Sequence, residues 1–262
     1  MDILVSIACY RDPRITATIN SLYSGAKFPH RIYTWVYWQG ETLHEPLYKG
    51  KYHDNVHVEE THYTNAKGPL VARHHIMMTA TPRYYFLQID AHTTFISNWD
   101  VDLMTCFYTC GDNPIISFHP ADTLDTQQVA YTNFWVPSKD DNRLPIITSK
   151  YIDGSIPPKQ QRFAVGCFFF SYYSTALEMF KRIHIDKYQM IFHGEEILMS
   201  AVLHDMGCRI FPPHKNLCSH AYAKHKIQPY LKDKLNKQWI DQQNQSIENL
   251  IVEISCFLNI IG

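Results

Sequence analysis

Two side chains that can bind a metal ion, Asp90 and His92, end an apolar run that covers residues 84–92 (Tyr-Tyr-Phe-Leu-Gln-Ile-Asp-Ala-His). Side chains at positions i and i+2 of an extended chain point the same way, so Asp90 and His92 are expected to converge while Ala91 faces the other side. A carboxylate and an imidazole at a strand end suit a divalent cation whose coordination is completed by phosphate oxygens. The residues alone also allow a second interpretation, in which Asp90 caps the next helix and His92 lies on the surface.

The elements that would position this pair alternate between strand-like and helix-like patterns, which is typical of parallel βαβ units in an α/β fold. The pattern predicts strands at residues 3–8, 32–38, 56–60, 84–90, 115–118, 163–170 and 208–211. It predicts helices at residues 13–25, 68–80, 99–110 and 195–206, the first of them capped by Asp12 and opened by Pro13.

Two segments do not fit this alternation. Residues 120–160 are rich in Pro, Asp, Asn, Thr and Lys, with only scattered apolar residues, and we interpret them as a long irregular functional loop that faces a second substrate. The tail from residue 226 to residue 262 is polar and then apolar, which indicates a C-terminal helical extension to a main domain at residues 1–225.

Composition bounds the classes of function. The 262 residues carry 24 Lys and Arg against 25 Asp and Glu, so no overall field would attract nucleic acid or an acidic membrane. No segment reaches the roughly 20 apolar residues that a membrane span needs. The seven cysteines form no CxxC pair and lie mostly in apolar runs, which predicts reduced, buried thiols. With no signal peptide recognisable, a cytoplasmic protein is expected, and its oligomeric state stays open.

Six separated segments together resemble the GlcNAc-type glycosyltransferase family, which includes the cytoplasmic hydroxyproline N-acetylglucosaminyltransferases and is related to the polypeptide GalNAc-transferases. Their order and spacing carry more weight than any one of them. The segments are Val5–Pro13, Gly68–Arg73, Leu87–His92, Asn98–Asp100, Phe192–Glu196 and His220–Tyr222. Cys9 and Ala91 depart from the family, which usually has Ser at both positions, and neither change removes a presumed ligand.

The resemblance implies a GT-A fold, in which a mostly parallel sheet flanked by helices has a Rossmann-like nucleotide-binding half. It implies metal-dependent transfer, with retention of configuration, of a sugar from a UDP-sugar to a hydroxyl acceptor on a protein or glycan. N-acetylglucosamine is the expected sugar and Mn²⁺ the expected cation, with Mg²⁺ as the alternative. Such a cation would stabilise the charge that gathers on the departing UDP.

The resemblance also assigns roles to individual residues. His220 is expected to be the third metal ligand, and the alternative is a surface histidine. Glu195 and Glu196 are expected beside the donor sugar, with Glu195 bonded to its hydroxyls, although carboxylates at a helix start are also favourable through the helix dipole alone. Arg73 is expected to pair with the diphosphate or with an acidic side chain near the sheet. Residues expected at the nucleotide are Tyr10 and Arg11 and, more weakly, Gln39 and Glu60.

Three alternatives stay open on the sequence. A transferase of the same fold could use UDP-galactose or UDP-GalNAc. A binding module could keep the nucleotide cleft without transfer, and a metal-dependent hydrolase is a third class, although no activating base is evident beside the cation. The sequence also does not separate double displacement from same-face attack.

Overall fold

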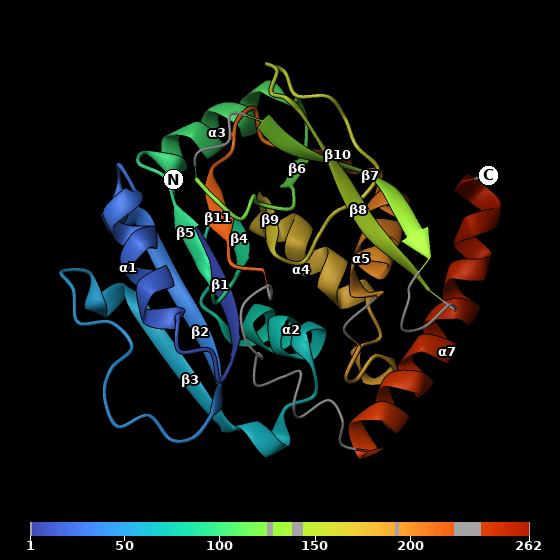
Figure 1. The fold of residues 1–262 in the computed structure, drawn as a ribbon, viewed down its shortest axis with the longest axis horizontal. Helices are drawn as coiled ribbons and strands as arrows, with labels where there is room; N and C mark the ends of the chain where they lie inside the picture. The colour runs from blue at the N-terminus through green and yellow to red at the C-terminus, as the bar shows by residue number, and fades with distance from the viewer. Residues whose placement is uncertain (1, 125–127, 138–143, 192–193, 223–236, 262) are drawn as a thin grey trace.

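The computed structural model describes residues 2–124, 128–137, 144–191, 194–222 and 237–261. Its centre is a seven-stranded sheet with the strand order β10-β6-β9-β4-β1-β2-β3 (Figure 1). The strands are β1 (Ile3–Tyr10), β2 (Ile32–Gly40), β3 (Val56–His62), β4 (Tyr85–Asp90), β6 (Pro114–Ser117), β9 (Phe168–Tyr172) and β10 (Arg209–Phe211). All pairings are parallel except those of β9, which runs antiparallel to β4 and β6.

Helices cover both faces of this sheet, because its central strands are apolar on both sides. In β4, for example, Leu87 packs into one hydrophobic cluster and Phe86 into the other. The first cluster also holds side chains from α1 (Ile15–Gly25) and α3 (Trp99–Thr109). The second holds side chains from α2 (Pro69–Thr79), α4 (Tyr173–Arg182) and α5 (Glu195–Asp205). This layered, mostly parallel arrangement is the predicted α/β fold.

In the part of the chain that the structure describes, two small antiparallel sheets and four short 3-10 helices accompany the central sheet and its helices. One sheet pairs β5 (Thr93–Phe95) with β11 (Cys218–His220), and the other pairs β7 (Gln128–Pro137) with β8 (Pro145–Asp153). The 3-10 helices are η1 (Pro29–Arg31), η2 (His53–Asn55), η3 (Tyr63–Asn65) and η4 (Ile185–Lys187).

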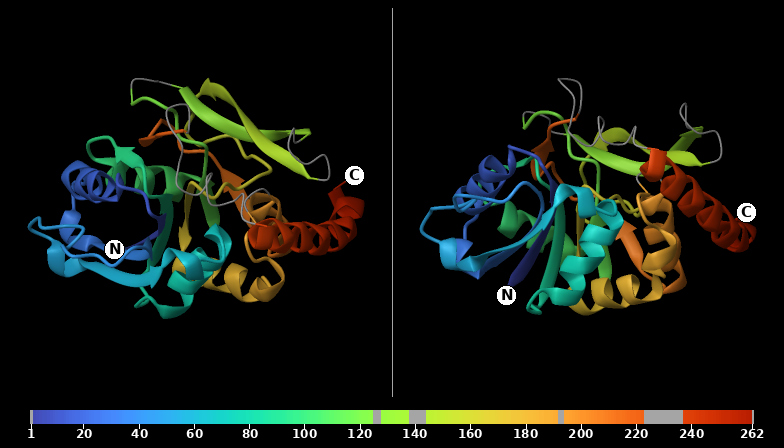
Figure 2. Two further views of the ribbon diagram at one scale, coloured as in Figure 1. Left: turned by 60° about the horizontal axis from the view of Figure 1, so that its bottom comes forward. Right: turned by 90° about the horizontal axis from the view of Figure 1, so that it is seen from below.

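The structure corrects two of the predicted elements. The interpretation of residues 120–160 as irregular is wrong, since the segment contains the paired antiparallel strands β7 and β8, which lie across one end of the sheet in Figure 2. The predicted strand at residues 163–170 begins only at Phe168, because Gly166 and Cys167 form a turn that reverses the chain into the antiparallel strand β9. The residues just before β9 therefore lie at the same edge as the carboxyl ends of its parallel neighbours.

The part of the tail that the structure describes is a long helix, α7 (Lys237–Ile261), which runs beside α5 (Figures 1 and 2). Its Ile247 and Leu250 are buried in the second cluster. Ser246 Oγ donates a hydrogen bond to the Gln189 carbonyl oxygen at 2.6 Å. The extension therefore shares a core with the sheet and helices before it. None of the helices in the described part of the chain is long and apolar enough to cross a membrane.

Candidate active site

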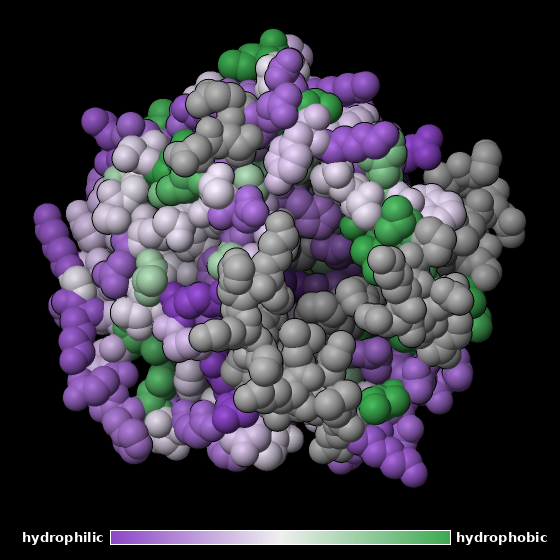
Figure 3. Space-filling view, viewed as in Figure 1, coloured by the Kyte–Doolittle hydropathy of each residue, from purple (hydrophilic) through white to green (hydrophobic). Residues whose placement is uncertain are grey.

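A cavity of about 510 Å³ opens where the parallel strands of the sheet end. Figure 3 shows a hollow with hydrophilic residues near the middle of this face. The lining comes from the ends of β1, β2 and β4, from α2, α5 and α7, and from the β7–β8 hairpin. It includes Tyr10, Asp12, Gln39, Arg73, Asp90, His92, His119, Ile147, Gly166, Glu195, Glu196, His220, Tyr222 and Trp239.

Asp90, His92 and His220 form a cluster on the floor of this cavity. Their potential ligand atoms all lie within 4.8 Å of one another. His220 Nε2 lies 2.9 Å from Asp90 Oδ2, and the two imidazole rings have centroids 4.4 Å apart. The three side chains expected to hold a metal are therefore brought together.

Local pairing explains how His220 reaches residues that are about 130 positions away. Asp90 is the last residue of β4, and His92 follows in a tight turn rather than in the strand itself. After the turn, Thr93 opens β5 and pairs directly with His220 at the end of β11. The backbone N–H of Ala221 also donates to the His92 carbonyl oxygen at 3.1 Å.

Asp12, which the sequence analysis interpreted only as a helix cap, is part of this site. One carboxylate oxygen, Oδ1, accepts a hydrogen bond from the backbone N–H of Arg14 at 2.9 Å, just before α1. The other, Oδ2, lies 2.9 Å from His92 Nδ1. Burial raises the pKa of Asp12, but hydrogen bonds from His92 and Arg14 outweigh it and hold the pKa well below its usual range. A proton on His92 Nδ1 directed at this carboxylate leaves the Nε2 lone pair for a ligand.

Arg73 connects the cluster to the acidic start of α5. Its buried guanidinium donates to Asp90 Oδ1 from Nη2 at 2.8 Å and to Glu195 Oε1 from Nη1. Burial lowers the pKa of Arg73, but the charges of Glu195 and Asp90 outweigh it and raise that pKa above its usual range. Arg73 therefore pairs with acidic side chains near the sheet, which is one of the two roles expected for it.

The ion pair between Arg73 and Glu195 depends on the absence of a side chain at Gly166. A Cβ atom there would lie 2.5 Å from Arg73 Nη1 and 2.7 Å from Glu195 Oε1. The Gly166 carbonyl oxygen accepts from Gln88 Nε2 at 2.8 Å, which fixes the turn against β4. Any larger residue would push the guanidinium and the carboxylate apart.

Glu195 and Glu196 begin α5, after Gly194 in a left-handed conformation at φ 108°. Glu195 Oε2 is buried and has no hydrogen-bond partner within the described ranges. Glu196 Oε1 accepts from the Gly166 backbone N–H at 3.1 Å. Burial raises the pKa of Glu195 to about 7, against the opposing charge of Arg73, and burial also raises the pKa of Glu196 to about 7.

His119 is a second residue of this site that the sequence did not predict. Its Nε2 lies 3.8 Å from Glu196 Oε1, and its Nδ1 lies 2.7 Å from the hydroxyl of Ser149 in β8. Burial lowers the pKa of His119 to about 4, so the imidazole is neutral at pH 7. No sequence signal marks His119, because its partners come from α5 and the hairpin.

The residues expected at the nucleotide divide into two groups. Tyr10 and the buried Gln39 line the cavity, at the ends of β1 and β2. Arg11 turns away to an ion pair with Glu41 at 2.8 Å. Glu60 Oε2 accepts from the backbone N–H of Leu43 at 3.0 Å. Neither Arg11 nor Glu60 is among the residues that line the cavity.

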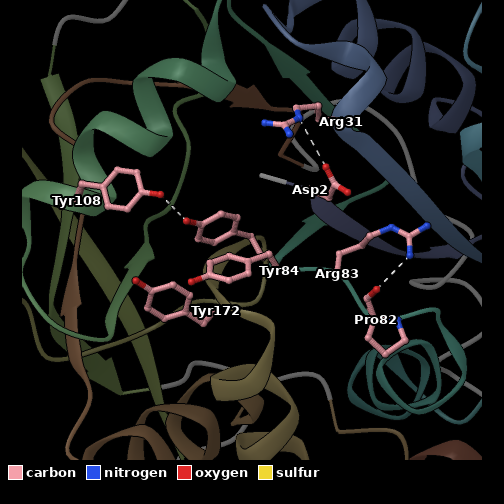
Figure 4. A pocket seen from close by; sticks show the side chains of 8 residues that line it. Asp2, Arg31, Pro82, Arg83, Tyr84, Tyr108 and Tyr172 are labelled. Carbon is pink, nitrogen blue, oxygen red and sulfur yellow. Dashed lines mark hydrogen bonds and ion pairs between the residues drawn. The ribbon is translucent and has the colours of Figure 1, made fainter.

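A second hollow lies at the opposite edge of the sheet, among tyrosine side chains (Figure 4). Its polar groups largely engage one another. The hydroxyls of Tyr85 and Tyr108 lie 2.6 Å apart, and Arg31 faces Asp2 at 3.7 Å. Asp90, His92 and His220 lie instead in the first cavity, so we expect the reaction to take place there.

Comparisons with known proteins agree with this geometry. The family model described as "Glycosyltransferase (GlcNAc)" matches residues 2–52 and 48–255, and the chain belongs to this family. The family match extends into α7, beyond the main domain predicted at residues 1–225.

Among solved structures, a crystal structure of GalNAc-T7 with UDP, GalNAc and Mn²⁺ is similar, with a TM-score of 0.61 at 12% sequence identity. The match covers 89% of this chain and 47% of that one, so this chain spans about half its length. At this identity the likeness establishes the fold, which is the expected GT-A fold. No sequence among the curated proteins matches the chain.

Proposed function

We propose that this glycosyltransferase moves N-acetylglucosamine from UDP-N-acetylglucosamine to a hydroxyl group of a protein or glycan, with retention of configuration and with Mn²⁺ as cofactor. One observation carries the proposal: a cluster of three possible metal ligands is joined through Arg73 to the carboxylates at the start of α5. The GalNAc-T7 structure, which contains UDP, GalNAc and Mn²⁺ in a similar fold, supports it. The family description supports N-acetylglucosamine as the sugar.

The residues present fit a divalent cation. One carboxylate and two imidazoles are a borderline donor set that suits Mn²⁺ and leaves coordination positions for phosphate oxygens. Asp12 next to His92 Nδ1 is the carboxylate-histidine arrangement that orients metal-binding imidazoles. Asp90, His92 and His220 would therefore hold the ion, and its chemistry would be to neutralise the charge that gathers on the leaving diphosphate.

The chain's own groups can do the remaining work of binding and orientation. Arg73 keeps Asp90 and Glu195 in fixed positions on either side of its guanidinium. Glu195 Oε2, buried without a partner within the described residues, is available to accept hydrogen bonds from hydroxyls of the donor sugar. We therefore assign Glu195 to sugar binding, with Oε1 held by Arg73 and Oε2 directed at the sugar hydroxyls.

The acceptor is proposed to approach from the hairpin side of the cavity. Ile146 and Ile147 of β8 line the cavity together with Tyr222, near His119 and Glu196. The same hairpin exposes Trp135 and Tyr151 to solvent, at 60% and 51% of their surfaces. Apolar and aromatic side chains beside a cavity suit a polypeptide or a sugar ring.

A cytoplasmic location is also proposed. The six cysteines whose side chains the structure describes are free and buried, as expected for a reducing compartment. A tagged chain found in the cytosolic fraction, with its thiols reduced, would support this location.

Calorimetry and a donor panel test the proposed activity. The wild-type chain should bind UDP only when Mn²⁺ is present, and it should hydrolyse UDP-N-acetylglucosamine slowly, faster than UDP-galactose or UDP-GalNAc. Asp90→Asn and His92→Ala should abolish both properties while circular dichroism stays unchanged. Wild-type turnover by either variant would refute the assignment. Binding of UDP without turnover of any donor would instead indicate a non-catalytic module.

A further inference from the structure

Trp239, from the first turns of α7, lines the same cavity as the metal cluster. Its ring meets the ring of Tyr10 edge to face, with centroids 5.7 Å apart and an interplanar angle of 69°. The two residues are more than 200 positions apart in the chain. We propose that Trp239 is a nucleotide-binding residue, which together with Tyr10 forms an aromatic wall for the uracil base; this inference rests on the proposed function.

The order of the strands determines on which side of the cluster the base would lie. In the sheet, β1 and β2 lie on one side of β4, and β9 and β6 lie on the other. Glu195, proposed to bind the sugar, contacts Gly166, which precedes β9. A diphosphate held at Asp90 with its sugar toward Glu195 must therefore extend its nucleoside over the ends of β1 and β2. Ligands in open α/β sheets bind where the strand order reverses, which in this sheet is between β1 and β4, next to the inferred nucleoside position.

The side chains on the β1–β2 side match the chemistry of uracil. Tyr10 ends β1 and pairs in register with Gln39 of β2, and both line the cavity. The amide of Gln39 has both a donor and an acceptor, as does the imide edge of uracil. A flat base also needs a face against which to pack, and Trp239 and Tyr10 are the aromatic side chains described on this side.

Trp239 is held in place by the rest of α7. Leu250 and Ile247 are buried in the second cluster, and Asn249 Nδ2 donates to the Lys187 carbonyl oxygen at 2.9 Å. Leu250 also reaches the start of α5, since a Cβ atom added to Gly194 would lie 2.5 Å from its Cδ2. The helix that carries the aromatic wall therefore also packs against the turn that presents Glu195.

The test compares two ligands on three variants, by calorimetry in the presence of Mn²⁺. UDP reports on the whole nucleotide site, whereas inorganic pyrophosphate reports only on the metal and phosphate part. Trp239→Ala should weaken UDP binding about 10-fold, in keeping with the loss of one base-aromatic stack, and should leave pyrophosphate binding unchanged. Trp239→Phe should recover most of the UDP affinity. Ile240→Ala, a matched change of the next residue, which is 43% exposed, should bind both ligands as the wild type does.

Fluorescence gives a second readout of the same contact. UDP should quench the tryptophan emission of the wild type, and Trp239→Phe should lose most of this quenching while still binding UDP. Unchanged UDP affinity in Trp239→Ala would overturn the inference. Tighter UDP binding would also overturn it, because Trp239 would then occupy the place of the base, and so would an equal loss of pyrophosphate binding. A wild type that binds pyrophosphate with Mn²⁺ but not UDP would refute the proposed function itself.

Discussion

His92 Nδ1 lies 2.9 Å from Asp12 Oδ2, which ties the loop after β1 to the turn after β4. We expect Asp12→Asn to lower the affinity for Mn²⁺ about 10-fold, because an amide supports the imidazole less well than a carboxylate does. Titration of Mn²⁺ by calorimetry measures this change. Arg14→Ala is the matched control, since it removes the other ion pair of Asp12, at 2.6 Å, and leaves the His92 contact. Equal affinities for Asp12→Asn and the wild type would exclude the orienting role.

Arg73 is expected to contribute strongly to stability. Arg73→Met leaves two carboxylates, Asp90 and Glu195, without their cationic partner, and it should lower the free energy of unfolding by about 3–5 kcal/mol. Adding Glu195→Gln should recover part of the loss, because it removes one of the unpaired charges. Urea denaturation measures both variants.

Arg182 provides the control for this prediction, since it also has two acidic partners, Glu178 and Asp205, but lies at the surface. Arg182→Met should destabilise the chain far less than Arg73→Met, because exposed ion pairs contribute little to stability. Similar losses for the two arginine variants would mean that burial does not determine the strength of the Arg73 pairs.

The carboxyl group of Glu196 should make stability depend on pH. Burial raises its pKa from 4.5 to about 7, so between these values the folded chain binds a proton that the unfolded chain lacks. This contribution to stability is therefore complete below about pH 4.5 and is lost as the pH rises through about 7. Its size is on the order of 1–3 kcal/mol.

Glu196→Gln stays neutral at every pH and isolates this effect. Melting temperatures of the variant and the wild type, measured between pH 5 and pH 8, should diverge as the pH rises, with the wild type losing stability relative to the variant. Parallel curves would show that Glu196 is not the group that titrates in this range.

Packing of α7 should depend on Leu250, which is fully buried. Leu250→Ala should destabilise the chain by about 2–5 kcal/mol, through lost apolar burial and the cavity that it leaves. Val252→Ala, on the same helix but 72% exposed, should change stability by less than about 0.5 kcal/mol. Thermal denaturation checks both values. An equally small effect of Leu250→Ala would imply that α7 contributes little to the shared core.

Much of the core sheet follows from the sequence, because its strands are long apolar runs bounded by helix signals. The closeness of Asp90 and His92 also follows from the sequence, because the two residues are only two positions apart. His220 was predicted only from the family resemblance, because no local spacing relates it to Asp90, 130 positions away. The strands β5 and β11 that bring it there have three residues each, too few to show any periodicity.

Long-range contacts account for what the sequence analysis missed. The prediction that Asp12 caps the first helix and Pro13 opens it is wrong, because α1 begins at Ile15 with Arg14 as its cap residue. One oxygen of Asp12 accepts locally from the Arg14 backbone N–H, and the other contacts His92, 80 positions away. The β7–β8 hairpin escaped recognition because its partly exposed strands mix polar and apolar residues and contain a register shift between Tyr131 and Phe134. The partners of His119 that the structure describes, Ser149 and Glu196, both lie far from it in the sequence.

The groups of the centre come from widely separated parts of the chain: Asp12, Asp90 and His92, and finally His220. During synthesis the first three can meet before the last has been made, so a truncated chain that ends before β11 would lack one of the three possible ligands. Tight Mn²⁺ binding should accordingly arise late, after the closing ribbon of β5 and β11 has formed. Binding of the ion would thereby indicate that β1, β4 and the ribbon of β5 and β11 have assembled.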